Sequence, residues 1–292
     1  MARSGVSLLR QARSFVALVL LASVALVPRL GATQAAAPTA SQSPAAAVAI
    51  QLRPRVGDVF RTRLDQLVEV IGTMRHAGQD TTVTVRTDLV VLTQSRVEKV
   101  DDDGATVLAV TDSVTLYTTG SADKWMDQTM RHLRGQRLRI HLAPDGAVSL
   151  AEKSDHDERE LQALVAQMPA LLPRGPVTVG SSWSRAMEVP VAGQPEARLG
   201  AEVVATFRLD SLVGDLAWIS MSGTLRPTRR RDGDAMQAEL AGTVNGWVVV
   251  DRRRGWIVDA RTMLNVRSTV AATKDAAAMR FRMRIEQRLR AN

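Results

Sequence analysis

Alternation of apolar and polar residues with a period of two is the main pattern of the chain after residue 50. In residues 279–286 every second side chain is apolar and the others are charged; the apolar set is Met279, Phe281, Met283 and Ile285. The same alternation runs through residues 60–70, 137–142 and 202–210. Successive side chains of a strand point to opposite faces, so each segment predicts a strand with one face in the core and one in water. We interpret these segments as half-buried antiparallel strands.

Turn-forming sequences separate the alternating segments. Hairpin loops are predicted at residues 101–104 (DDDG), 144–146 (PDG), 214–215 (GD) and 252–255 (RRRG). Residues 199–213 and 256–271 predict strands well beyond the usual length of about 5–6 residues. Long strands favour a strongly curved sheet. The expected fold class is therefore mainly β (α+β), a long curved antiparallel sheet or half-barrel.

One segment breaks the period of two and predicts a helix over residues 155–172. Its apolar side chains follow the i, i+3, i+4 spacing of one helical face; they are Leu161, Leu164, Val165, Met168, Leu171 and Leu172. Acidic residues open the segment and Pro173 follows it, as expected at the two ends of a helix. We expect this amphipathic helix to pack on the apolar face of the sheet.

The stretches before and after the predicted helix resemble each other. Residues 56–61 (VGDVFR) match residues 179–184 (VGSSWS), and each half later carries an L-x-G element before a hairpin. This order predicts a single β-rich domain over 51–292, made of two similar halves, 51–152 and 176–292, joined by the helix. Short motifs of this kind also recur by chance in antiparallel proteins, and that interpretation stays open.

The N-terminal sequence is typical of export. Residues 1–32 predict a Sec-type signal peptide, with a basic start and an apolar run at 15–27, and residues 33–50 an Ala/Pro/Ser-rich flexible spacer. The apolar run is shorter than the roughly 20 residues that a membrane span needs. No later segment comes closer, so no integral membrane span is expected after signal removal. The expected location is periplasmic or secreted, unless the uncleaved signal serves as an anchor.

Composition narrows the classes of function. The chain has no cysteine, so disulfides, thiol chemistry and a lipidated cysteine are excluded. The formal charge is +8, but four arginines lie in the predicted signal, which leaves about +4 on the mature chain. Aromatic residues make up 3%, which counts against the exposed rings of base-stacking and carbohydrate-binding surfaces. We expect no nucleic-acid partner.

Motifs for catalysis, metals and cofactors were not found. No G-x-S-x-G or H-E-x-x-H sequence occurs after the signal, and no glycine-rich loop precedes a helix. The sequence Asp155-His156-Asp157 fits helix capping better than metal binding. Residues 101–104 fit a solvated turn better than a calcium loop, because they lack the acid spacing of one. We therefore expect no enzyme activity, no metal and no cofactor.

Two runs of arginine are candidates for contact with an anion or an acidic partner. They are Arg229–Arg230–Arg231 and Arg252–Arg253–Arg254. Such runs more often form exposed hairpin tips, and the neighbouring Gly233 and Gly255 support that interpretation. The first run is kept as a candidate anion or partner site.

Three sequence segments resemble an exported bacterial family of unknown function. They are "RPRVGDVFRTRL" at residues 53–64, "LLPRGPVTVGSSW" at 171–183 and "GTVNGWVVVDRRRGWIVDA" at 242–260. The resemblance spans nearly the whole mature chain and implies a fold, with no catalytic residues. The architecture also resembles the half-barrels of periplasmic lipoprotein carriers, which is an analogy of fold only.

The sequence is consistent with three different functions. The first is a non-enzymatic binding module that holds an apolar or lipid-like small molecule beneath the helix; its candidate residues are Phe60, Leu164, Met168, Phe207, Ile219, Val266 and Phe281. The second is a structural or interaction protein of the bacterial envelope, with an envelope protein as partner. The third is a hydrolase whose site the sequence does not reveal.

Overall fold

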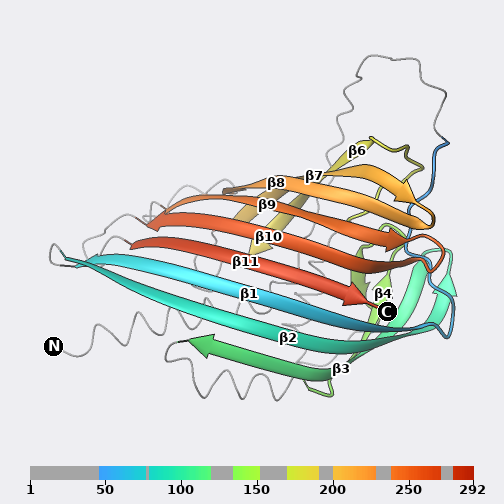
Figure 1. Ribbon diagram of the computed structural model, residues 1–292, viewed down its shortest axis with the longest axis horizontal. Coiled ribbons are helices and arrows are strands. Elements are labelled where there is room, and N and C mark those ends of the chain that lie inside the picture. The colour runs from blue at the N-terminus through green and yellow to red at the C-terminus, as the bar shows by residue number, and fades with distance from the viewer. Residues whose placement is uncertain are drawn as a thin grey trace, which may run out of the picture.

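A single antiparallel sheet of eleven strands forms the described part of the protein (Figure 1). The computed structural model describes residues 46–76, 79–119, 134–151, 170–190, 200–227, 238–270 and 279–292. The first five strands are β1 (Val59–His76), β2 (Gln79–Asp101), β3 (Gly104–Thr119), β4 (Arg137–Leu142) and β5 (Val148–Leu150). The others are β6 (Ser182–Pro190), β7 (Gly200–Val213), β8 (Leu216–Pro227), β9 (Ala238–Asp251), β10 (Trp256–Val270) and β11 (Met279–Ala291).

The strand order joins two meanders at the middle of the sheet. The order is β5-β4-β3-β2-β1-β11-β10-β9-β8-β7-β6, so the first and last strands are neighbours and β5 and β6 are the edges. Thirteen consecutive residue pairs from Thr62↔Ala291 to Met74↔Met279 join β1 to β11. The predicted long antiparallel sheet is confirmed.

Several tight turns lie at one end of the sheet, which we call the turn end. Four of them, β2–β3, β4–β5, β7–β8 and β9–β10, occur at the positions that the turn sequences predict. Glycines with positive φ occupy each of them: Gly104, Gly146, Gly214 and Gly255. Glycine adopts this conformation without the steric cost that other residues meet there. The predicted hairpins are confirmed.

Two irregular segments, 46–55 and 170–181, run between the edges of the sheet at the turn end. Val48 and Val177 exchange two backbone hydrogen bonds of 2.9 Å. The β4–β5 turn accepts one bond from each segment: Leu52 N–H donates to Pro144 O at 2.8 Å, and Leu172 N–H to Asp145 O at 2.9 Å. Backbone hydrogen bonds therefore connect the two edges here, although β5 and β6 are not paired.

The predicted helix over 155–172 is not supported by the structure. Residues 155–169 lie outside the described residues, and residues 170–172 are not helical. Leu172 instead takes part in the segment between the edges, with its side chain 1% exposed. Within the described ranges there is no helix that is long and apolar enough to cross a membrane.

The main core lies between the inner faces at the turn end. Its buried residues come from β7, β8 and β9 on one side and from β4 and the two irregular segments on the other. Ile50 is completely buried in it, so the last residues of the predicted flexible spacer belong to the fold. Residues 1–45, with the predicted signal and most of the spacer, lie outside the described residues.

The turns that precede β1 and β6 have the same hydrogen bonds. Gly57 N–H donates to Val97 O, and Gly180 N–H donates to Leu209 O. A side-chain oxygen closes each turn: Asp58 accepts from the backbone N–H of Arg55, and Ser181 from that of Thr178. The similar sequences 56–61 and 179–184 therefore adopt the same local structure.

Candidate functional site

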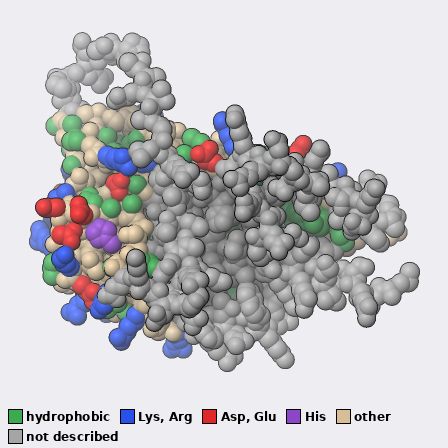
Figure 2. All heavy atoms as spheres, turned by 180° about the vertical axis from the view of Figure 1, so that it is seen from behind, with side chains coloured by type: hydrophobic (Ala, Val, Ile, Leu, Met, Phe, Trp, Pro, Cys, Tyr) green, Lys and Arg blue, Asp and Glu red, His purple; other side chains and the backbone are tan. Residues whose placement is uncertain are grey.

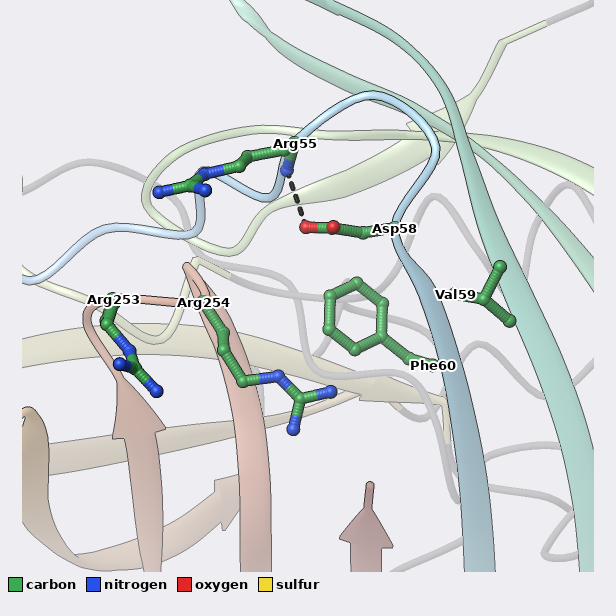
Figure 3. A pocket seen from close by; sticks show the side chains of 6 residues that line it. All are labelled: Arg55, Asp58, Val59, Phe60, Arg253 and Arg254. Atoms are coloured by element: carbon green, nitrogen blue, oxygen red, sulfur yellow. Dashed lines mark hydrogen bonds between the residues drawn. The ribbon is translucent and has the colours of Figure 1, made fainter.

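A pocket of about 340 Å³ opens at the turn end, beside the start of β1 (Figure 3). We call it the end pocket; its lining residues are Arg55, Asp58, Val59, Phe60, Arg253 and Arg254. Arg55 and Asp58 belong to the turn before β1, Val59 and Phe60 begin β1, and Arg253 and Arg254 belong to the β9–β10 turn. The fold thus joins two distant segments around a pocket that carries three guanidinium groups and one carboxylate.

The turn before β1 is held by its own hydrogen bonds. Gly57 has φ +88°, and Asp58 N–H donates to Arg55 O at 3.0 Å. The Asp58 Oδ2 atom accepts a bond of 2.8 Å from the Arg55 N–H, as Figure 3 shows. This carboxylate is engaged by the backbone, while the side chain of Arg55 extends away from it.

The β9–β10 turn is also fixed by a carboxylate. Asp251 Oδ1 accepts from the backbone N–H groups of Arg253, at 2.9 Å, and Arg254, at 3.0 Å. Gly255 has φ +60°, and a Cβ atom there would stand 2.3 Å from the carbonyl carbon of Arg53. Only glycine lets this turn approach the segment before β1 so closely. The close approach brings Arg253 and Arg254 beside the turn of Arg55.

Aromatic rings support the inner side of the end pocket. Phe60 is 1% exposed and stacks on Trp256, with ring centroids 4.1 Å apart and planes 1° from parallel. The Arg254 Cζ atom lies 5.1 Å from the Phe60 centroid, within the range of a cation–π interaction. Because Phe60 is packed in the core, its ring holds the Arg254 guanidinium in one place.

Positive charge exceeds negative charge in the end pocket. Arg253 has one exposed contact of 3.7 Å with Asp215. No carboxylate of the described residues forms an ion pair with the side chain of Arg55 or Arg254. Two guanidinium forks are therefore available to bind the oxygens of a carboxylate or phosphate.

The described residues offer no group of three or more histidine, aspartate or glutamate side chains that could hold a metal ion.

Of the residues predicted to line an apolar-ligand site, Phe207 and Ile219 are buried together in the main core, and Val266 packs against that core. Phe60 belongs to a second cluster with Val97 and Val107. Phe281 lies against Gly72 of β1, where a Cβ atom would meet its ring at 3.4 Å.

Leu164, Met168 and the run Arg229–Arg230–Arg231 lie outside the described residues. The apolar-ligand site beneath a helix therefore stays a prediction, and so does the anion site at Arg229–Arg231. Arg55 is not among the predicted site residues. Arg254 belongs to the second arginine run, for which the neighbouring Gly255 favours a hairpin tip over an anion site.

A family model supports the resemblance seen in the sequence. The model of a Family of unknown function (DUF6263) matches residues 151–257 of this chain. The match includes Arg253 and Arg254 of the end pocket and excludes Arg55. The predicted resemblance to a family of unknown function is confirmed over this segment. None of the curated proteins compared with the chain matches it.

Two solved structures have low similarity to the chain. The COG4313 outer membrane channel from Pseudomonas putida F1 is 8% identical, with a TM-score of 0.22 over 83% of this chain and 98% of that one. The translocator domain of autotransporter NalP from Neisseria meningitidis is 11% identical, with a TM-score of 0.15 over 79% of this chain and 88% of that one. Scores this low carry no argument about architecture or function.

Proposed function

We propose that this protein is a non-enzymatic binding module of the bacterial envelope that holds a carboxylate or phosphate group of its partner in the end pocket. The observation that carries the proposal is the set of arginines there. Arg55, Arg253 and Arg254 face one pocket, and its single carboxylate, Asp58, already accepts a bond from the backbone. A bound anion would accept hydrogen bonds from the guanidinium groups of Arg55 and Arg254, which form no ion pair with a carboxylate of the described residues.

The rigidity of the pocket supports binding rather than general surface charge. Arg254 lies against a buried aromatic ring, and both turns are closed by carboxylate hydrogen bonds. A guanidinium held in place loses less conformational freedom when it binds an oxyanion than a free surface arginine does. The pocket is open to solvent, so the anionic group can belong to a larger partner.

The proposal is tested by titrating the full mature chain with inorganic phosphate and, separately, with acetate at low ionic strength. We expect binding that weakens as salt is added. Arg55→Gln combined with Arg254→Gln should reduce the affinity at least about tenfold, because each lost charge-assisted hydrogen bond contributes about 1.5–3 kcal/mol.

Arg96→Gln is the matched control, since Arg96 is an exposed arginine of β2 that lies outside the end pocket. Combined with Arg226→Gln, at another exposed arginine outside the end pocket, its substitution removes the same two charges as the double variant and should leave the affinity unchanged. Equal affinities in the double variant and the wild type, for both anions, would exclude the end pocket as the site.

A further inference from the structure

A second pocket of about 580 Å³ lies on the outer face of the sheet, across β1, β11, β10 and β9. We call it the outer trough. Its charged lining residues are Glu69, Arg267, Arg282 and Arg284, and its uncharged polar side chains are Asn265 and Thr243. It is separate from the end pocket, with which it shares no residue.

Two arginines of the outer trough stand directly opposite each other. Arg267 of β10 is the register partner of Arg282 of β11, and both side chains are exposed. Residues directly opposite in an antiparallel pair have Cα atoms about 4.5–5.5 Å apart. Like charges at such positions destabilise a sheet. This pair therefore has an energetic cost in the free protein.

Several other arginines of the outer face near the middle of the sheet form ion pairs with carboxylates. Asp65 binds Arg63 and Arg290, Arg288 pairs with Asp259, and Glu286 contacts both Arg284 and Arg261. By contrast, no carboxylate in the described ranges forms an ion pair with Arg267 or Arg282. Glu69, the carboxylate in the trough lining, is the register partner of Arg284 and of Arg86.

The outer trough has the groups that a phosphate needs. Two guanidinium forks on neighbouring strands can each donate two parallel hydrogen bonds to oxyanion oxygens. The Thr243 hydroxyl and the Asn265 amide add uncharged donors in the same lining. A doubly charged anion between the two arginines would also replace their repulsion with attraction.

We propose that the outer trough is a second anion site that binds a phosphate group, free or esterified, between Arg267 and Arg282. This site is independent of the end pocket and of the function proposed for it. In the free protein, repulsion between the two arginines lowers the stability of the fold, and a bound phosphate group would remove this repulsion.

The proposal predicts that one substitution has opposite effects without and with ligand. Arg282→Gln in the full mature chain should raise the thermal midpoint by about 1–3 °C in phosphate-free buffer, because it removes the like-charge pair. It should also weaken binding of inorganic phosphate at least about tenfold, because one fork is lost. Arg267→Gln should behave in the same way.

Binding is measured in the Arg55→Gln/Arg254→Gln background, so that the end pocket does not contribute. Phosphatidic-acid vesicles are tested beside inorganic phosphate to distinguish an esterified from a free phosphate. Loss of either interaction in Arg282→Gln, with Arg96→Gln unaffected, supports the proposal. A lower thermal midpoint for Arg282→Gln in phosphate-free buffer, or unchanged binding of both probes, overturns it.

Discussion

Asp65 shows how single residues order the charged outer face. Its carboxylate accepts bonds from Arg63 of its own strand, at 2.7 Å, and from Arg290 of β11, at 2.8 Å. The hydrogen bond from Arg63 is the main cause that lowers the pKa of Asp65; burial opposes it, and the hydrogen bond from Arg290 lowers the pKa further. One carboxylate thus neutralises two arginines that lie opposite each other in register.

This shift predicts a dependence of stability on pH. A carboxylate whose pKa is lower in the folded than in the unfolded state stabilises the protein above its unfolded pKa of about 3.9, and this stabilisation is lost as the pH falls through the folded value. Asp65→Asn should therefore reduce the free energy of unfolding at pH 7 by up to about 1 kcal/mol. The difference from wild type should shrink steadily below pH 4.

Urea unfolding at pH 7 and at several values below pH 4 measures this difference. Asp112→Asn is the control, because Asp112 is an exposed aspartate of β3 for which no ion pair occurs among the described residues. A loss of stability in Asp65→Asn that stays constant across this range would contradict the assignment.

At the scale of elements, β6 is attached to the segment before it by side chains rather than by strand pairing. The Trp183 indole N–H donates to Leu171 O at 2.9 Å, and the Arg185 guanidinium donates to Leu172 O at 2.8 Å. Burial is the main cause that lowers the pKa of Arg185, with Arg174 adding to the effect. These contacts hold residues 170–181 between the β4–β5 turn and the edge strand.

Trp183→Phe tests this attachment. The variant keeps an aromatic ring against Phe207, whose centroid lies 6.0 Å away, and removes only the N–H donor and part of the ring. We expect a loss of about 1–2 kcal/mol in the free energy of unfolding, because the Leu171 carbonyl loses its partner. Trp218→Phe, on the outer face beside Trp247, should change it by less than about 0.5 kcal/mol. Equal effects of the two substitutions in urea unfolding would show that the indole bond does not hold the segment.

At the scale of the molecule, the turn end connects distant parts of the described fold. At the turn end, segments 46–55 and 170–181 connect the edges through backbone hydrogen bonds, and the main core lies between them. Figure 2 shows basic, acidic and apolar side chains intermingled on the described surface at one end of the molecule, seen from behind. The pairing of β1 with β11 and of β11 with β10 places the β9–β10 turn beside the start of β1.

Amide hydrogen exchange tests this closure. We expect the N–H groups of Val48, Leu52, Leu172 and Val177 to exchange slowly although none belongs to a strand, since each donates to a backbone carbonyl. The amide of Val179, for which the described chain provides no acceptor, should exchange much faster and serves as the internal reference. Exchange of all five amides at similar fast rates would mean that the edges are not connected in solution.

Local features of the fold were predictable from the sequence because they depend on neighbouring residues. The alternation at residues 199–213 matches β7 (Gly200–Val213), and the one beginning at Met279 matches the start of β11. The predicted turns hold glycines with positive φ. The helix prediction failed at residues 170–172, where the backbone donates to the β4–β5 turn and not to its own segment. Apolar spacing cannot distinguish a helical face from an irregular segment whose leucines are buried from both sides.

The sequence by itself determined the period-two strands, their turns, the absence of cysteine and an arginine-rich polar face. Only the tertiary structure decided that β1 lies beside β11, that Asp65 neutralises Arg290, and that Arg267 stands opposite Arg282. The tertiary structure also places Arg55 and Arg254 in the lining of one pocket. The physical reason is that alternation defines which way a side chain points, whereas its neighbours across the sheet depend on pairing between strands far apart in the chain. The two candidate anion sites depend on that pairing.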